Sequence, residues 1–434
     1  MIKSGLDFLL RGDYLSLAPG QLVTRFDTYI QWLILIWYGI TLVVSLTGLA
    51  VTFLRYRRGR ATQHIPPSST NELPGVTIFR PICGLDFQLR ENLISSLEQQ
   101  YPKFEVIFSF NKADDPAIPL VRELIDEYPH VDARLIIEER SVAVNPKINN
   151  LVEPYRVAKH EVMWIWDSNV RLPPGCLHRS VQKLLSPQYG LVHHLPLGAD
   201  ALSLGADMEA AFLNTTHARV YLGLNQLSIG SCVIGKSNLY LRKTLQQIGG
   251  LEKFLDIIAE DTAIATAIWN VGYWHAMTCD VARHPLGSMS VWEHFARRAR
   301  WARIRRTTVT FATLIEPFSE SILLGLLVGW SVHSLFNLSG KWFFVAHMLA
   351  WFLMDMTIAR NIAGNEIVWP RLILGWVLRE LSALPLFIYA MVGSRFGSRL
   401  KWRGREYRIR YGGKGQVVTQ ANGWRNNHHQ KKAL

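Results

Sequence analysis

The chain contains two kinds of hydrophobic pattern. Long apolar runs lie near both ends, and short apolar runs separated by amphipathic stretches fill the region between them. The first long run, residues 29–54, carries no charge and, at about 1.5 Å per helical residue, exceeds the roughly 30 Å core of a bilayer. It is too long for the core of a signal peptide, so we expect a retained spanning helix.

Five short apolar runs predict buried β-strands. Each has the length of a strand, and patterns of helical period such as "LRENLISSLEQQY" lie between them. Apolar strands that alternate with amphipathic helices predict a parallel α/β sheet covered on both faces, in which ligands bind beyond the carboxyl ends of the strands. The predicted strands are 76–82, 104–110, 133–139, 162–168 and 190–196.

Three further apolar stretches follow, at 321–338, 342–359 and 372–392. The first two predict a helical hairpin around "NLSGK". The third contains Arg379 and Glu380, which are costly in hydrocarbon unless they face protein, so it is expected either to re-enter the membrane or to line a lipid groove. The side on which the basic tail lies depends on whether this stretch spans.

Composition agrees with a chain that is part soluble and part membrane-embedded. Of its 434 residues 49% are hydrophobic and only 19% are charged. Arginines directly after the first span predict that the following chain faces the cytosol, namely Arg55, Arg57, Arg58 and Arg60. Four cysteines far apart and without a C-x-x-C pair predict neither a disulfide framework nor a zinc site.

Two aspartates follow predicted strands. Asp167 ends the run "VMWIWDS", and Asp115 lies in "FNKADDP" just past the second strand. A metal-bound nucleotide diphosphate needs hard oxygen ligands, so Asp167 is a candidate ligand for Mg²⁺ or Mn²⁺ and Asp115 a candidate partner of the base or ribose. Either residue alone also fits a turn or a helix cap. No P-loop and no G-x-G-x-x-G follows a strand, so neither an ATPase nor a dinucleotide enzyme is favoured.

A third acidic position lies at the start of an apolar helical stretch. Glu260 and Asp261 open "EDTAIATAIWN". A carboxylate there suits a general base that takes a proton from an acceptor hydroxyl, and it equally suits a charge that complements the helix dipole. These residues alone leave both interpretations open.

An arginine-rich stretch, "HFARRARWARIRR", precedes the second membrane region. Arg297 and Arg300 share a helix face and suit a departing pyrophosphate, and Trp301 can pack against a substrate or a neighbouring helix. A juxtamembrane basic helix held by anionic lipids is the alternative. Nucleic acid is disfavoured, because the basic charge accompanies membrane spans and no readout motif.

From about residue 73 to about residue 413 the chain resembles the animal ceramide glucosyltransferases. The resemblance rests on seven phrases in order: "DDPAI", "YPHVDARLII", "NPKINNL", "WIWDS", "GLVHHLP", "IAEDTAIATAI" and "RRARW". It implies a GT-A type α/β fold, an Mg²⁺ or Mn²⁺ cofactor, and inverting transfer of glucose from UDP-glucose to the primary hydroxyl of ceramide. The product would be β-glucosylceramide, the first step of glycosphingolipid synthesis.

The resemblance also implies roles for individual residues. It makes Asp261, Arg297, Arg300 and Trp301 catalytic, and it makes Asp167 the metal ligand. His217 and Glu260 would contact substrate or inhibitor, although His217 also fits a core histidine and Cys232 an inert buried thiol. The residues expected to bind the nucleotide sugar are Asp115, Lys147, Asn150, Asp167 and Cys232.

The resemblance completes the expected division of the chain. It comprises an extension (1–28), a transmembrane helix (29–54), a basic cytosolic linker (55–74), a GT-A catalytic domain (75–290), an arginine-rich interfacial helix (291–308), membrane helices (309–393) and a basic tail (394–434). We expect a multi-pass protein of the Golgi or endoplasmic reticulum with its catalytic domain in the cytosol, and "KKAL" at the end fits a di-lysine retrieval signal.

Two departures and two rival functions accompany this expectation. Asn169 stands where a D-x-D motif has its second aspartate, and Thr262 stands where vertebrate relatives have an aromatic residue.

A processive polysaccharide synthase would need more and longer spans. A non-enzymatic lipid-binding or transport protein would have no use for UDP.

Overall fold

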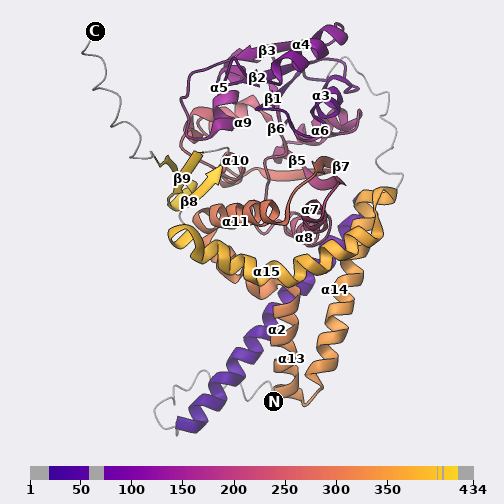
Figure 1. Ribbon diagram of the computed structural model, residues 1–434, viewed down its shortest axis with the longest axis vertical. Coiled ribbons are helices and arrows are strands. Elements are labelled where there is room, and N and C mark those ends of the chain that lie inside the picture. Colours follow the sequence, from indigo (N-terminus) through magenta and orange to yellow (C-terminus); the bar gives the residue numbers. More distant parts are fainter. Residues whose placement is uncertain (1–18, 58–72, 398, 403–404, 419–434) are drawn as a thin grey trace, which may run out of the picture. The chain divides into compact units, whose positions relative to one another are not determined.

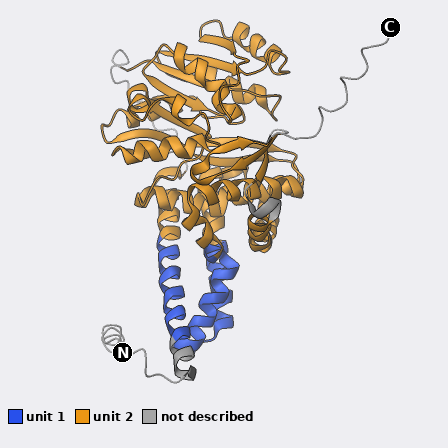
Figure 2. Ribbon diagram, turned by 90° about the vertical axis from the view of Figure 1, so that its left-hand side faces the viewer, with its two compact units in different colours: residues 1–43, 318–352 blue, residues 44–317, 353–434 orange. Residues whose placement is uncertain are grey.

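The computed structural model describes residues 19–57, 73–397, 399–402 and 405–418. The expectations for Arg58, Arg60 and the terminal "KKAL" lie outside these residues. The chain divides into two compact units, one formed by the residues up to Val43 with Phe318–Phe352 and the other by Val44–Pro317 with Leu353 onward (Figure 2).

A seven-stranded sheet forms the centre of the second unit (Figure 1). Its order is β3-β2-β1-β4-β6-β5-β7, and all five predicted strands are present. The strands are β1 (Val76–Pro81), β2 (Phe104–Phe110), β3 (Asp132–Ile137), β4 (Val162–Trp166), β5 (Tyr189–Ala201), β6 (Ser237–Leu241) and β7 (Trp274–Gly287). The predicted α/β fold of GT-A type is confirmed.

The five predicted strands run parallel to one another, as expected, but the sheet contains a further strand that the sequence did not predict and that runs antiparallel. β6 runs antiparallel to both β4 and β5, whereas the other pairs are parallel. The residue that precedes β6, Lys236, accepts a hydrogen bond from the main chain of Asp167, just past β4. The chain therefore enters β6 at the carboxyl end of β4 and must run back along it.

Alternate residues of the central strands pack into two cores, one on each face. Val106, Trp164 and Trp166 join helices α3 (Leu89–Leu97), α4 (Ile118–Glu127) and α6 (Cys176–Leu184). Ile107, Met163 and Ile165 join the opposite core, with α5 (Pro146–Val157), α9 (Arg242–Gln247) and α10 (Glu260–Asn270). Because successive strand residues face opposite sides, a continuous apolar run is the expected sequence of a strand covered on both faces.

The remaining elements of this unit surround one end of the sheet. They are α7 (Leu204–Phe212), a π-helical turn (Leu213–His217), α8 (Ala218–Leu227), α11 (Val291–Thr308), α12 (Thr310–Ile315), α15 (Trp369–Gly397) and a small sheet of β8 (Arg399–Trp402), β9 (Arg405–Ile409) and β10 (Gly415–Val417). A reciprocal capping box of Ser290 and Glu293 starts α11, which fixes where the arginine-rich helix begins.

All four long apolar runs form helices. Among the described residues, Phe26–Tyr56, Gly340–Glu366 and Trp369–Val392 are long and apolar enough to cross a membrane, and the bent pair Thr310–Ser319 and Ser321–Phe336 is a fourth candidate. The corresponding helices are α2 (Pro19–Val51), α14 (Gly340–Ala363), α15 and α13 (Ser321–Phe336).

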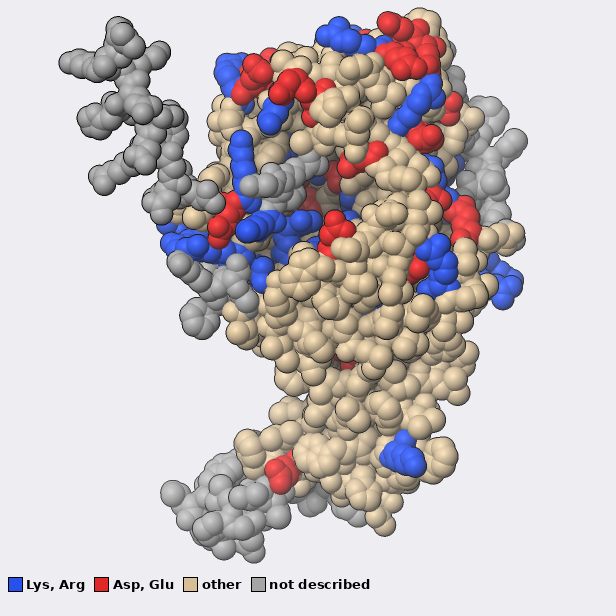
Figure 3. Space-filling model, in the orientation of Figure 1, with Lys and Arg blue, Asp and Glu red and all other residues tan. Residues whose placement is uncertain are grey.

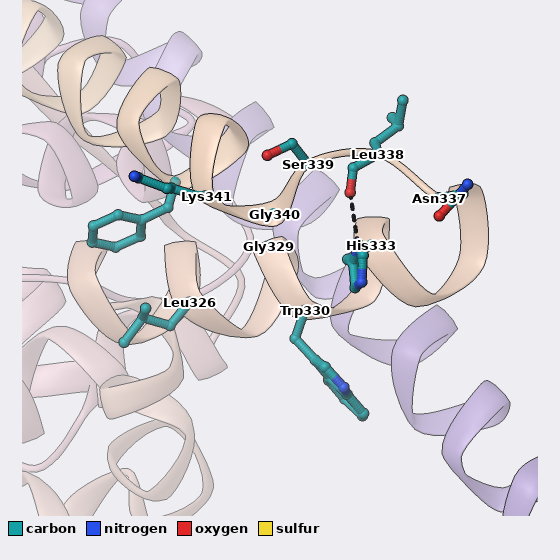
Figure 4. Close-up of a pocket in the computed structure, with 10 residues that line it drawn as sticks. Leu326, Gly329, Trp330, His333, Asn337, Leu338, Ser339, Gly340 and Lys341 are labelled. Carbon is teal, nitrogen blue, oxygen red and sulfur yellow. Dashed lines mark hydrogen bonds between the residues drawn. The ribbon is translucent and has the colours of Figure 1, made fainter.

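The predicted hairpin around "NLSGK" joins α13 to α14 (Figure 4). Asn337 ends α13 in the left-handed conformation at φ 55°, and the Nδ1 atom of His333 donates to the carbonyl of Leu338 at 3.0 Å. A Cβ atom on Gly340 would lie 2.4 Å from the carbonyl oxygen of Gly329, so glycine is needed at this close approach. The open pocket beside the turn is lined by two glycines, by four apolar side chains and by four polar ones, His333, Asn337, Ser339 and Lys341.

Candidate functional site

The loops after β1 and β2 are tied together by Asp115. Its Oδ2 atom accepts a hydrogen bond from the main chain of Gly84 at 2.8 Å, and its Oδ1 accepts one from Ala117 at 3.0 Å. Gly84 has a φ of 72°, which glycine adopts without strain. Asp115 thus lies at the rim, as predicted, and shapes the two loops that would surround a nucleotide.

Asp167 lies at the carboxyl end of β4 between a buried lysine, Lys236, and a partly buried one, Lys147. Its Oδ1 atom is 2.8 Å from the ammonium of Lys147, and its Oδ2 is 3.4 Å from that of Lys236. Burial raises the pKa of Asp167, but the two ammonium groups outweigh burial, and the pKa falls below its ordinary value. Asp167 is therefore ionised at neutral pH.

Lys147 connects this aspartate to the third acidic position. Its ammonium is 3.0 Å from Glu260, and it donates to the carbonyl of Gly235 at 3.1 Å. Burial lowers the pKa of Lys147, but Asp167 and Glu260 more than reverse this, and the pKa is raised above its ordinary value. A permanently charged lysine thus holds the ends of β4 and α10 together.

Asn145, which the sequence analysis missed, organises this region. Its side chain caps α5 by accepting from the main chain of Lys147, and its amide donates to the carbonyl of Ile258 at 3.0 Å and to Glu260 at 2.5 Å. Both Glu260 oxygens are therefore engaged. The available signal was the N-cap pattern Asn-Pro at the start of a helical stretch.

Asp261 lies beside Glu260 and is partly exposed. Its carboxylate passes so near Gly235 that a Cβ atom there would lie 2.8 Å from its Oδ2, so this approach requires glycine. Burial raises the pKa of Asp261 to about 6, with the neighbouring charge of Glu260 adding to the rise. A carboxylate whose pKa is raised into this range is suited to take a proton as a general base.

The donor set beside Asp167 fits the divalent cation that the resemblance implies. The Lys236 ammonium is 3.4 Å from Asp167 Oδ2 and 2.8 Å from the amide oxygen of Asn169, so two oxygens converge on one positive charge. Carboxylate and amide oxygens are ligands that Mg²⁺ and Mn²⁺ accept. Asp167 and Asn169 would hold such a cation, and Lys236 supplies positive charge at the same place.

The arginine motif is held by a carboxylate that the sequence analysis also missed. Glu209, on α7, is fully buried, and its oxygens lie 3.1 Å from Arg297, 3.1 Å from Arg298 and 3.0 Å from Nδ1 of His294. Trp301 packs over the Arg298 guanidinium at 4.0 Å. No local pattern marks Glu209, because an acidic residue in the first turns of a helix is common.

The arginine helix and the Asp167 region influence each other electrostatically. Burial lowers the pKa of Lys236 to about 8, and Arg297 adds to this lowering while Asp167 opposes it. Figure 3 shows side chains of both charges gathered around a hollow on the face in view. Arg300 is half-buried on the same helix.

The other predicted site residues have more varied surroundings. His217 stacks on Tyr221 at 5.2 Å, and its Nδ1 has no hydrogen-bond partner among the described residues. Burial, with Arg298 and Arg305 adding, lowers the pKa of His217 to about 3, so it is neutral. Burial raises the pKa of the Cys232 thiol to about 11. The Asn150 amide donates to the carbonyl of Ile82 at 2.8 Å and so supports the rim through the main chain.

A second polar cluster lies in the core, away from these residues. Ligand atoms of Cys176, His194 and Asp280 come within 4.8 Å of one another. Arg179 binds both Asp280 oxygens, at 2.6 and 2.9 Å, and the two His194 nitrogens are hydrogen-bonded to serines. The cluster is a satisfied hydrogen-bond network in which the Arg179 guanidinium already pairs with Asp280, so we assign it a packing role.

Comparison with known proteins places this geometry in a family. The model of glycosyl transferase family 21 matches residues 40–415. A ceramide glucosyltransferase of Komagataella phaffii is 33% identical over 86% of this chain and 89% of its own length, and ceramide glucosyltransferase 3 of Caenorhabditis elegans is 30% identical over 86% and 81%. The solved structure of the mannosyltransferase PcManGT from Pyrobaculum calidifontis, in complex with GDP-Man and Mn²⁺, aligns with a TM-score of 0.48 at 17% identity, over 84% of this chain and 100% of that one. The chain belongs to glycosyl transferase family 21.

Proposed function

We propose that this chain transfers glucose from UDP-glucose to the primary hydroxyl of ceramide, with inversion, to form β-glucosylceramide. Membership of family 21 and the names of its relatives support the reaction class. The observation that carries the proposal is a partly exposed carboxylate with raised pKa, Asp261, in the same lysine-linked cluster as Asp167. An animal-type assignment is part of the proposal, because the chain is about as identical in sequence to a fungal relative (33%) as to an animal one, from a nematode (30%).

The donor would bind over the rim formed by β1, β2 and β4. Asp115 shapes the loops for the base and ribose, and Asp167 with Asn169 would hold a divalent cation at the diphosphate. Such a cation, Mg²⁺ or Mn²⁺, adds positive charge where the leaving group becomes negative. Lys147, Lys236 and Arg297 supply fixed positive charge in the same region, with Arg300 and Trp301 on the same helix.

Asp261 would act as the general base. It takes the proton of the ceramide hydroxyl while that oxygen bonds to the anomeric carbon, and the bond from this carbon to the UDP oxygen breaks with its electron pair passing to UDP. Attack from the face opposite the leaving group inverts the anomeric centre. Glu260, with both oxygens bound by Lys147 and Asn145, would support the substrate site by fixing this arrangement.

The acceptor would lie near His217. Its imidazole is neutral, and its Nδ1 lacks a partner among the described residues, so it is available to a lipid headgroup. Cys232, a neutral thiol near the site, would contribute packing rather than nucleophilic chemistry. Ceramide remains in the bilayer, and the candidate spans of this membrane protein would keep the site at the headgroup plane. We place the enzyme in Golgi or endoplasmic reticulum membrane, with the site facing the cytosol.

Donor choice tests the proposal directly. Purified, detergent-solubilised full-length protein with Mg²⁺ or Mn²⁺ is expected to convert short-chain ceramide to glucosylceramide from radiolabelled UDP-glucose, with little product from UDP-galactose. Thin-layer chromatography against both standards reads the outcome. Galactose transfer would correct the donor, and a folded sample that uses neither donor would favour the lipid-binding alternative.

Lys236→Met should weaken UDP binding most when divalent metal is absent. The substitution removes the positive charge from the oxygens of Asp167 and Asn169, and a loss of about tenfold in Kd, roughly 1.4 kcal/mol, is expected in EDTA. Saturating Mg²⁺ should recover most of this loss. Titration calorimetry with UDP measures it, with the exposed Lys243→Met as control, and equal affinities for wild type and Lys236→Met in EDTA would contradict the assignment.

A further inference from the structure

Helix α15 has the composition of a membrane span but the packing of a surface helix. Residues Trp369–Val392 have a mean hydropathy of 1.5, enough for a spanning helix by length and composition. In the structure, α15 lies along α7 and α11 (Figure 1). Its packing therefore decides between spanning and lying at the surface.

One face of α15 is buried against the α/β domain. Leu372, Trp376, Arg379, Glu380 and Ala390 are at most 7% exposed. Arg379 and Glu380 form an ion pair within this buried face, so neither charge meets lipid. The two residues that make a spanning helix costly are thereby accommodated.

Contacts with the domain extend along the whole of α15. Near its start, Arg371 pairs with Asp207 of α7 at 3.0 Å. Near its end, the Arg303 guanidinium of α11 donates to the carbonyl of Ala390 at 3.1 Å, and Trp292 packs on Tyr389. Both halves of the helix thus rest on helices of one domain.

The chain is also attached to this domain before and after α15. Glu366, just before the helix, forms an ion pair with Arg283 of β7. After the helix, the small sheet β8–β10 packs Leu400, Tyr407 and Ile409 against Ile258, two residues before Glu260. The main chain of Ile258 donates to the carbonyl of Gly413 at 3.0 Å. Crossing the bilayer between these attachments would require the domain to lie on both sides.

The opposite face of α15 is a continuous apolar stripe. Its members fall within an arc of about 80° at 3.6 residues per turn, and all are exposed. They are Leu374, Val377, Leu381, Leu384, Ile388 and Val392, with exposed fractions of 49, 40, 63, 39, 53 and 67%. An apolar surface of this length needs a cover, and a chain with other helices fit to cross a membrane has a bilayer beside it.

We propose that α15 lies in the plane of the membrane surface with this stripe immersed in lipid. The helix anchors the catalytic face to the bilayer and returns the chain to the same side, so β8–β10 and the basic tail share the side of the α/β domain. This inference rests on packing and is independent of the reaction.

A labelling experiment tests the side of the tail. A cysteine added after Leu434 and Glu123→Cys on exposed α4 are compared in sealed proteoliposomes of full-length protein, using a membrane-impermeant maleimide before and after permeabilisation. Both are expected to react to the same extent at each stage. The background carries serine at Cys83, Cys232 and Cys279, and retains the buried Cys176. Opposite accessibility of the two cysteines would overturn the proposal.

Depth measurements distinguish an in-plane helix from a span. Bimane on Leu374→Cys, Leu381→Cys and Ile388→Cys is quenched by lipids with nitroxides at shallow or deep positions. An in-plane helix predicts the same shallow depth at all three sites, whereas a span predicts a depth change of about 21 Å between the outer two at about 1.5 Å per residue. A gradient of depth along the three sites would overturn the proposal. Sites that lipid does not quench, but that cross-link between copies of the protein, would also overturn it, because a second copy would then cover the stripe.

Discussion

Asp261→Asn is expected to lower glucose transfer to ceramide by roughly 10²–10⁴-fold, the usual contribution of a general base. The amide is nearly isosteric with the carboxylate but cannot take a proton at neutral pH. UDP affinity should change little, because the lysines and Asp167 remain in place. Single-turnover transfer and UDP titration on the same sample separate the two effects.

The same substitution should stabilise the protein at neutral pH. Burial raises the pKa of Asp261 to about 6, so the folded state holds the charged form at a cost. Above pH 6 the neutral amide avoids this cost, and the free energy of unfolding should rise by about 3 kcal/mol. As the pH falls below 6 the folded aspartic acid becomes protonated, and near its unfolded pKa of about 3.9 the advantage disappears. The gain in melting temperature of Asp261→Asn over the wild type should therefore be smaller at pH 5 than at pH 7.5.

The pH dependence of the wild type follows from the same group. Transfer should fall as the pH drops through about 6, because a protonated Asp261 cannot accept the proton of the hydroxyl. The matched control for Asp261→Asn is Asp126→Asn, the same change at an exposed position of α4. If Asp261→Asn retained a tenth or more of wild-type transfer, the base would have to be another residue.

Glu209→Gln is expected to reduce both stability and turnover. Burial raises the pKa of Glu209, but Arg298, Arg297 and His294 outweigh burial, so its pKa lies below the ordinary value and the group is a carboxylate. Removing its charge leaves two guanidinium groups without their buried partner, which costs about 3–5 kcal/mol. Because Arg297 loses its anchor near Lys236, kcat should fall by roughly 10- to 100-fold, a change of about 1.4–2.7 kcal/mol.

Two comparisons separate a loss of Arg297 positioning from a loss of protein stability. Rates are measured at a temperature at which circular dichroism shows each variant folded, and kcat is compared with KM for both substrates. Glu209→Asp keeps the charge on a shorter side chain and should recover part of kcat, whereas Glu209→Gln should not. A Glu209→Gln protein that is less stable but turns over at the wild-type rate would limit Glu209 to a structural role.

The sequence by itself determined the class of fold and half of the site. Two apolar runs of strand length, each followed by an aspartate, place Asp115 and Asp167 at the rim, because a strand buried on both faces leaves its polar neighbours only beyond its ends. The long apolar runs likewise specify helices wherever they occur. These are local patterns, which the chain carries whatever its tertiary contacts.

Only the tertiary structure decided which charges meet. Asn145 and Glu260 lie 115 residues apart in the sequence, and Arg298 and Glu209 lie 89 apart. Lys236 comes to Asp167 because β6 runs antiparallel beside β4, and that direction follows from where the preceding loop enters the sheet. Helix α15 shows the same principle, since its composition fits a span. Its buried Arg379–Glu380 face and its attachments at both ends determine its place, because a charged pair is tolerated only where protein covers it.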